Sequence, residues 1–446
     1  MDLQYYMRQY NGLFFALLLV PTPFSASAQS ASDSLLQVAS LQNCIQYAIK
    51  HQPAIQQALL DEEITERQIS TKLADWYPQL NFNYNLQHNF QVPTTVFAGN
   101  TVKIGVNNTS TAQFAFTQTI FNKDVLLASR SAKDVRTRVK QLTSENKIDI
   151  TINVTKAFYN VLVTQQQINL LNEDILRLER SLKDAYSQYQ AGIVDKIDYK
   201  RATITLNNAK AQKRQNEELL KSRYANLRLQ MGYPPAAELY VLYDSIKMEK
   251  DAFIDTAQPI NYENRIEYQL LQTQKRLQQS NLSYNKWNFL PTLSAFGTYN
   301  LNFLNNEFAK LFNQNYPNSF AGLSLSFPIF QGTKRVQQVR EAELELKRVE
   351  YDIISLKNAI SADYTNAISS YKSAVNYYYI LKDNLEIAKE VYNTIQLQYK
   401  SGVKTYLDVI IAETDLRTAQ VNYTNALYEV VSSKLDVQKA LGSVQY

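Results

Sequence analysis

Long stretches of the chain carry apolar residues at the spacing of a helix surface. In one of them, alternating steps of three and four residues separate five apolar side chains: Ile168, Leu171, Ile175, Leu178 and Leu182. A second stretch, at 381–399, follows the same rule. Such steps place the side chains on one stripe of an α-helix and are typical of a coiled-coil seam. The pattern therefore predicts helices that pack along their length.

Glycine and proline, the strongest helix breakers, are absent from these stretches. Neither residue occurs at 122–191, 193–231, 333–401 or 403–441. The first and third of these segments each have roughly 69 residues, which corresponds to a helix of about 100 Å. A helix of that length does not fit inside an ordinary globular domain, so we expect a structure that covers distance.

The breakers themselves occur in two matched sets. Gly192 and Gly232 return as Gly402 and Gly442, about 210 positions later, and the residues at 189–193 resemble those at 399–403. We therefore expect a duplicated half-molecule, with a first repeat at 29–232, a mid-height connector at 233–264 and a second repeat at 265–446. Each repeat is predicted to run from a helix through two strands, a long helix and a tight turn (189–198 and 399–408) to a shorter helix.

Four segments alternate apolar and polar residues with the two-residue period of a β-strand. They lie at about 78–90, 110–121, 291–303 and 319–330. Phe296 breaks the alternation in the third segment, and Pro328 confines the fourth to an edge or an end of a sheet. One apolar and one polar face are what the wall of a membrane barrel requires.

Four strands are too few to close such a wall. A sheet edge in lipid leaves backbone groups without hydrogen-bond partners, so the sheet has to close on itself, and barrels begin at about eight strands. Three copies of the chain would supply twelve strands. The alternative is a soluble hairpin that packs one face on a helical core.

The N-terminus predicts export. Arg8, an apolar run at 13–20 and Ala26-Ser27-Ala28 form the three parts of a signal peptide at 1–28. The run is too short to span a bilayer, which takes about 20 residues, and no later stretch approaches that length. We therefore expect no transmembrane helix in the mature chain.

Charge and composition argue against nucleic-acid binding and catalysis. The 46 basic and 41 acidic side chains are spread along the chain and leave a net charge of +5 without a basic patch. His51, His88 and the single Cys44 show no metal-ligand spacing, and the sequence has no glycine-rich phosphate loop or nucleophile elbow. We expect no enzyme activity, no metal site and no cofactor.

Three motifs resemble those of the TolC-type outer-membrane efflux and secretion channel family. They are the helix opening at 41–48 followed by His51-Gln52-Pro53, the strand-to-helix junction at 327–332, and the turn at 399–408. Ile266, which stands where the first half has Pro53, departs from the family pattern. The resemblance implies a mainly α fold with a membrane β-barrel portion. It also implies a trimer that forms a 12-stranded β-barrel in the cell outer membrane and a 12-helix α-barrel extending through the periplasm.

The resemblance further implies a function and its partners. The expected protein is a trimeric outer-membrane channel that conducts exported substrates, by efflux or type I secretion. It would work with a periplasmic adaptor (membrane fusion) protein and an inner-membrane transporter. The alternative, from another class, is an exported periplasmic coiled-coil protein, structural or adaptor, without a pore.

Specific residues at the two turns follow from the same resemblance. Four match positions that close the periplasmic end of the channel: Asp198, Tyr399, Lys404 and Asp408. Four others match positions that contact the adaptor: Gly192, Ile193, Gly402 and Val403. In a trimer, three Asp408 carboxylates around a narrow axis would attract cations and repel anions, but a second acidic position of the family falls on Ile411. Two simpler interpretations stay open, namely that Asp408 caps its helix and that Asp198 and Lys404 form an ordinary surface pair.

Overall fold

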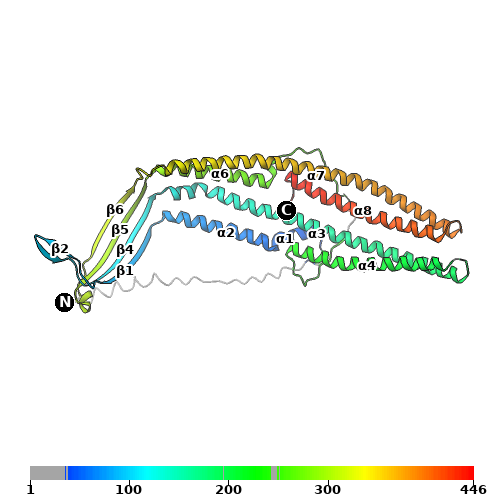
Figure 1. The fold of residues 1–446 in the computed structure, drawn as a ribbon, viewed down its shortest axis with the longest axis horizontal. Coiled ribbons are helices and arrows are strands. Elements are labelled where there is room, and N and C mark those ends of the chain that lie inside the picture. Colours follow the sequence, from blue (N-terminus) through cyan, green and yellow to red (C-terminus); the bar gives the residue numbers. More distant parts are fainter. Residues whose placement is uncertain (1–35, 37–38, 194, 243–248, 251) are drawn as a thin grey trace. The chain divides into compact units, whose positions relative to one another are not determined.

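The structure, a computed structural model, describes residues 36, 39–193, 195–242, 249–250 and 252–446 of the 446-residue chain. The predicted signal peptide at 1–28 lies outside the described residues. The chain divides into Met1–Gln37 and Val38–Tyr446, and every described helix and strand belongs to the second part (Figure 1).

The helices and strands follow one another in the same order twice. The first run contains α1 (Leu41–His51), α2 (Pro53–Leu73), the 3-10 turn η1 (Ala74–Trp76), β1 (Gln79–His88), β2 (Thr94–Phe97), β3 (Asn100–Lys103), β4 (Asn108–Phe121), α3 (Lys123–Gln190) and α4 (Lys196–Met231). The second contains η2 (Tyr262–Asn264), α6 (Ile266–Lys286), η3 (Trp287–Phe289), β5 (Thr292–Asn305), η4 (Phe308–Asn313), β6 (Asn318–Ser326), α7 (Lys334–Lys400) and α8 (Tyr406–Leu441).

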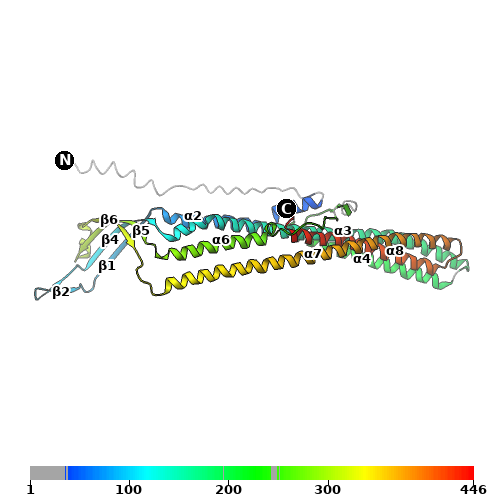
Figure 2. The ribbon, with the colours of Figure 1, turned by 90° about the horizontal axis from the view of Figure 1, so that it is seen from above.

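The long helices α3 and α7 run without interruption through the segments that lack glycine and proline. Next to the strands, α2 packs on α3, and α6 packs on both α3 and α7. Farther from the strands, α4 packs on α3, and α8 packs on α7 and α3 (Figures 1 and 2). No helix among the described residues is both long enough and apolar enough to cross a membrane.

The principal sheet is antiparallel, with the strand order β1-β4-β5-β6. Its register pairs Phe82 with Phe114, Phe114 with Tyr299, and Leu293 with Leu325. Directly paired residues share a face and side chains alternate along a strand, so most apolar positions of the four strands lie on one face, whereas Phe296 and Phe320 pack together on the other. The other face carries amides and hydroxyls, including Asn300, which donates to Asn318 Oδ1 over 2.7 Å.

The fourth strand is shorter than the pattern predicts. The expected range was 319–330, but β6 ends at Ser326. Pro328 has no N–H group to continue the ladder, and Ile329 lies beyond the strand with 87% of its surface exposed. The broken alternation at Phe296 also has a physical reason, because Phe296 pairs with Gly322 and its ring lies only 3.0 Å from where a Cβ of that residue would be.

A short hairpin between β1 and β4 was not predicted. β2 and β3 pair with each other in a separate two-stranded sheet, and the turn between them places Ala98 at φ 48° and Gly99 at φ 83°. Two consecutive positive φ angles define the tight turn favoured in hairpins, whose usual signal is Asn-Gly or Asp-Gly. Ala98-Gly99 lacks that signal, so the sequence pattern did not reveal the hairpin.

The shorter helix of each run ends against the helix start of the same run. Gly232 ends α4 at φ 66°, and a Cβ there would lie 2.9 Å from Gln52 Cα. Gln52 Nε2 donates to the carbonyls of Leu229 and Gln230 at 3.1 and 3.0 Å. At the end of α8, a Cβ on Gly442 would lie 2.5 Å from Asn264 O, and Arg265 Nη1 donates to Ala440 O at 3.3 Å. Arg265 thus takes the place of Gln52 where the second half departs from the Gln-Pro sequence.

Candidate functional site

Two tight turns lie at the ends of α3 and α7 that point away from the sheet (Figure 1). Each contains a glycine in the left-handed conformation, Gly192 at φ 74° and Gly402 at φ 79°. The residue after each glycine donates its N–H to a helix carbonyl five positions earlier, at 3.0 Å for Ile193 and 2.9 Å for Val403. These bonds close a Schellman motif, which favours glycine because a Cβ is strained at positive φ.

The returning helices begin with side-chain caps. Asp195 accepts a hydrogen bond from the Ile197 N–H at 3.2 Å and starts α4. Thr405 starts α8 through a capping box, in which Thr405 Oγ1 accepts from the Asp408 N–H while Asp408 Oδ2 accepts from the Thr405 N–H at 2.9 Å. Caps of this kind satisfy N–H groups that have no partner within the helix.

Asp408 therefore has a structural role within its own chain. The Thr405 hydroxyl also donates to Asp408 Oδ2 at 2.8 Å. Hydrogen bonds from the side chain and then the backbone of Thr405 lower the pKa of Asp408, and the positive charge of Lys404 adds to the effect. The carboxylate stays charged at neutral pH, so capping and a role in electrostatics are compatible.

The two helical hairpins contact each other just above the turns. We call the contact the tip cluster; it consists of Ala185, Ala202, Tyr399 and Tyr406, with Tyr199 and Leu182 at its edge. Tyr406 is 3% exposed, and Tyr399 donates its hydroxyl to Gln188 Oε1 at 3.0 Å across the two hairpins. Tyr399 and Tyr406 pack with ring centroids 5.8 Å apart. The tip cluster is thus the contact that keeps the two turns side by side.

Asp198 and Lys404 belong to different hairpins. Asp198 occupies the first turn of α4, and its charge contributes, after burial, to raising the pKa of Tyr399. Lys404 is exposed in the second turn. The ion pairs of the described residues do not include one between these two side chains. Of the four predicted residues, the fold brings Tyr399 and Asp198 near the same cluster and leaves Lys404 and Asp408 facing solvent.

The four residues matched to adaptor contact form exposed points on the turns. Ile193 and Val403 expose 73% and 72% of their surfaces. A Cβ added to Gly192 or Gly402 would meet no atom within 4 Å. Each turn therefore presents one apolar side chain beside an open stretch of backbone.

Sequence reasoning missed three charged residues in the packed interior. Asp174 and Arg177 of α3 and Glu413 of α8 meet between the hairpins, and Asp174 and Glu413 are 1% and 6% exposed. A usable signal existed, because Asp174 lies three residues after Leu171 and four before Leu178, on the apolar stripe itself. A carboxylate at a seam position of a coiled coil is uncommon and costly unless it is paired.

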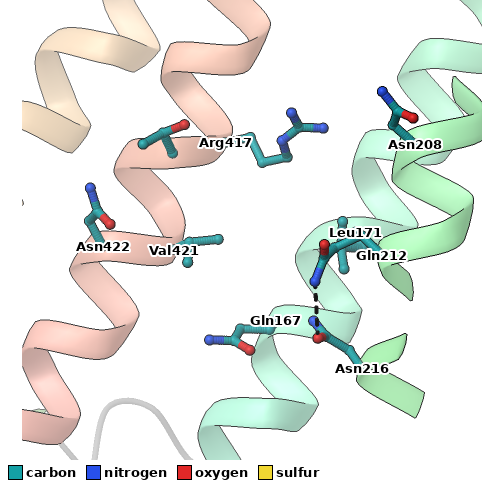
Figure 3. A pocket seen from close by; sticks show the side chains of 9 residues that line it. Gln167, Leu171, Asn208, Gln212, Asn216, Arg417, Val421 and Asn422 are labelled. Atoms are coloured by element: carbon teal, nitrogen blue, oxygen red, sulfur yellow. Dashed lines mark hydrogen bonds between the residues drawn. The ribbon is translucent and has the colours of Figure 1, made fainter. Parts of the chain in front are cut away.

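A cavity lies next to these charges, between α8 and the α3–α4 pair. Its volume is about 450 Å³, and Figure 3 shows its lining, in which Arg417 and Val421 come from α8 and face Leu171, Gln167 and Asn208. Gln212 and Asn216, hydrogen-bonded at 3.5 Å, complete the α4 side. The lining is dominated by side-chain amides, with one guanidinium group as its only charge.

The remaining candidates for chemistry among the described residues are clustered metal ligands and the thiol of Cys44. No group of three or more His, Cys, Asp or Glu side chains that could hold a metal ion occurs among the described residues. Cys44 is buried in α1, and burial raises the pKa of its thiol to about 12, which removes its reactivity as a thiolate.

Comparisons with known proteins match almost the whole chain. The sequence model of the family described as "Outer membrane efflux protein" matches residues 44–233 and 264–443. The chain is 20% identical over 432 residues to "Outer membrane protein TolC" of Vibrio cholerae serotype O1, covering 94% of each protein. It is 21% identical over 403 residues to "Alkaline protease secretion protein AprF" of Pseudomonas aeruginosa, covering 86% of this chain and 81% of the relative.

A solved structure shows a similar fold. The outer membrane protein VceC from Vibrio cholerae superimposes with a TM-score of 0.72 at 14% identity, covering 90% of this chain and 96% of that one.

Proposed function

Because the chain belongs to the outer membrane efflux protein family, we propose that three copies form one channel that carries exported molecules from the periplasm to the outside. The family consists of outer-membrane channels of efflux and secretion, and the mainly helical fold with one membrane-facing sheet is that of its members. The helices beyond the sheet form the long periplasmic part.

The proposal of three copies is based on the open sheet. The four strands have one continuous apolar face, and both β1 and β6 are edges within the described chain. On the apolar face Leu80 and Leu323 expose 72% and 70% of their surfaces. Lipid can cover such a face, but it cannot satisfy backbone groups at the edges. Edge pairing between copies supplies those partners, and twelve strands make a wall wide enough for a bore.

Two adjacent residues of β6 test this assignment. Leu323 lies on the apolar face and Ser324 on the polar face. We expect Leu323→Lys to block membrane insertion and trimer formation, since a lysine facing lipid costs about 2–4 kcal/mol in each of three copies. Ser324→Lys should leave trimers intact. The measurement is the mass of the protein in detergent by light scattering, with extraction from outer membranes as a second readout.

A wild-type protein with the mass of one chain would refute the shared wall. Equal tolerance of Leu323→Lys and Ser324→Lys would refute the assignment of the two faces.

The duplicated sequence supports a division into repeats at 29–232 and 265–446 with a connector at 233–264. The family match is itself interrupted at 233–264. In the connector, Glu249 accepts hydrogen bonds from Tyr378 and Lys382 of α7, each at 2.6 Å, and Ala252 accepts one from Tyr371 at 3.2 Å. The connector is thus attached to the side of α7 at mid-length.

The proposal includes a closable aperture at the turn end, to which Asp198, Tyr399, Lys404 and Asp408 contribute. Its support is the tip cluster, which holds the two hairpins of one chain together at their narrow end. The charge of Asp408, stabilised by Thr405, would be repeated three times around the axis of a trimer. A ring of like charges at a constriction selects for cations.

The proposal also includes partner proteins at the turns. Gly192, Ile193, Gly402 and Val403 are assigned to contact a periplasmic adaptor, which would link the channel to an inner-membrane transporter. Exposed apolar side chains beside unobstructed glycines support this assignment, because a helical partner can approach the backbone closely there. The name of AprF refers to protease secretion, so both secretion and efflux remain within the proposed function.

A further inference from the structure

Three charged side chains meet between the hairpins, two helical turns above the tip cluster. On α8, Glu413 follows Tyr406 by seven residues, which is about two turns. The guanidinium of Arg177 is hydrogen-bonded to Asp174 Oδ1, and its Nε lies 3.6 Å from Glu413 Oε1. Asp174 and Arg177 belong to α3, so the arginine joins one hairpin to the other. We call these three residues the clasp.

The carboxylates of the clasp are buried, and several of its polar atoms lack hydrogen-bond partners among the described residues. The side chains of Asp174 and Glu413 are 1% and 7% exposed, and that of Arg177 is 27% exposed. Asp174 Oδ2, Glu413 Oε1 and Arg177 Nε have no hydrogen-bond partner among the described residues. Two carboxylates therefore share one guanidinium in a poorly solvated layer. Removing carboxylates from water is costly unless each is fully paired, so the ionised clasp is strained.

The helices packed against the clasp carry further titratable groups. α3 adds Glu173, whose charge raises the pKa of Asp174, and α8 adds Arg417, whose charge lowers the pKa of both acids. From α7 comes Tyr392, and from the start of α8 comes Tyr406; the charge of Glu413 raises the pKa of both phenols. α4 contributes the apolar Leu206 and Ala209, packed on Leu178, while its Lys210 pairs with Glu179 at 2.8 Å. Arg417 is thus the only second cation near the two acids within the described residues, and Figure 3 shows it pointing into the cavity.

We propose that the clasp is a proton-sensitive contact: it holds α8 against α3 when one of its two carboxyl groups is protonated, and it weakens when both are ionised. The proposal rests on the channel proposed above, whose turn end opens when the hairpins separate. A protonated Glu413 leaves Asp174 and Arg177 as a neutral pair and removes the net negative charge of the three clasp residues. The cavity lined by Leu171 and Arg417, which lie about one helical turn from Asp174 and Glu413, is large enough to hold water.

The direction of the pH effect follows from burial. Burial raises the pKa of Glu413 to about 7 and also raises that of Asp174. A carboxyl group whose pKa is higher in the packed state stabilises that state at low pH, and this contribution is lost as the pH rises through the raised pKa. The hairpins should therefore be held most firmly below about pH 4.5, the ordinary value for Glu, and released progressively up to about pH 7.

Distances between spin labels at the hairpin ends test the proposal. Labels are attached at Gln190→Cys on α3 and Lys400→Cys on α7, both exposed positions, after the buried Cys44 is replaced by Ala. The labelled full-length chain is diluted with unlabelled chain, so that one labelled copy is measured per assembly. The expected result is a short, narrow distance distribution at pH 5 and a longer or broader one at pH 8, with a midpoint near the raised pKa of Glu413.

Isosteric variants assign the effect to the clasp. Glu413→Gln mimics the protonated acid and should keep the short distance at both pH values, and Asp174→Asn should act in the same direction. Glu429→Gln, on the exposed side of the same helix, is the matched control and should keep the wild-type response. An unchanged pH response in both Glu413→Gln and Asp174→Asn, or its loss in Glu429→Gln, would overturn the proposal.

Conductance in planar bilayers separates this inference from the proposed channel. A pH-dependent distance without any conductance would support the clasp and contradict the channel. Conductance with a distance that does not change between pH 5 and pH 8 would support the channel and contradict the clasp.

Discussion

Asp408 shows how one residue at the turn end can serve both folding and conduction. Its carboxylate completes the capping box of α8 with Thr405, and the same bonds keep its pKa below the usual value. The two interpretations that the sequence left open are therefore not exclusive. The capping role belongs to one chain, whereas an acidic ring requires three.

A pair of substitutions separates the two roles of Asp408. Asp408→Asn keeps an oxygen that can accept from Thr405 but removes the charge, and Asp408→Ala removes both. We expect both variants to lower the cation-to-anion permeability ratio in planar bilayers to a similar extent, because each removes three charges from the constriction. Only Asp408→Ala should lower the thermal unfolding temperature, because only it breaks the cap.

Unchanged ion selectivity in Asp408→Asn would show that the residue acts as a cap alone.

The contact between the helical hairpins depends on packing at two levels. The tip cluster places Tyr406 at 3% exposure between α3, α4 and α7, and the clasp adds charged groups two turns above it. The apolar level contributes the same stabilisation at every pH, and only the charged level responds to protons. The packing of the helices thus combines a contact that does not depend on pH, the tip cluster, with one that does, the clasp.

Tyr406 offers a test of the apolar level. Its hydroxyl is buried without a hydrogen-bond partner among the described residues. We expect Tyr406→Phe to leave the thermal unfolding temperature unchanged or higher, because it removes an unsatisfied polar group. Tyr406→Ala should destabilise each chain by about 3–5 kcal/mol through the cavity it leaves and should raise the conductance by loosening the turn end.

A marked loss of stability in Tyr406→Phe would mean that the hydroxyl has a partner in the assembled protein.

At the scale of the whole molecule, the chain is incomplete in two respects. Its sheet has two open edges and an apolar face that a single copy does not cover. Its turn end exposes Ile193 and Val403 without a neighbour in the same chain that buries them. Further copies of the chain can pair with the open edges of the sheet. A different protein that binds at the turns can bury the two exposed side chains.

Substitution of the exposed turn residues by charged ones tests whether another protein binds at the turns. We expect Val403→Asp and Ile193→Asp to reduce export and cross-linking to the adaptor at least tenfold, because a charge in a small apolar contact costs well over about 1.4 kcal/mol. Trimers should persist, since both side chains are exposed. Leu344→Asp, at a 68% exposed position of α7 near the sheet, is the control and should export normally.

Normal export by both turn variants would place the adaptor contact elsewhere on the helices.

The sequence by itself determined the elements whose signals are local. Apolar seams without glycine or proline predicted α3, α4, α7 and α8. The recurrence of Gly192 and Gly232 as Gly402 and Gly442 predicted the two turns. The alternation of apolar and polar residues predicted four strands. These predictions succeeded because helix period, strand period and left-handed glycines depend on neighbouring residues. The family, and the fold class that it implies, followed from the resemblance of three motifs, at 41–53, 327–332 and 399–408.

Only the tertiary structure decided which distant residues meet. It joined β4 to β5, placed Tyr399 beside Gln188, and brought Glu413 of the second half to Arg177 of the first. Residues more than 170 positions apart leave no periodic trace in one sequence, since such contacts depend on how strands pair and long helices pack rather than on local preference. The β2–β3 hairpin was not predicted for a related reason. The pairing of its two strands imposes a positive φ on Ala98, which an alanine does not favour.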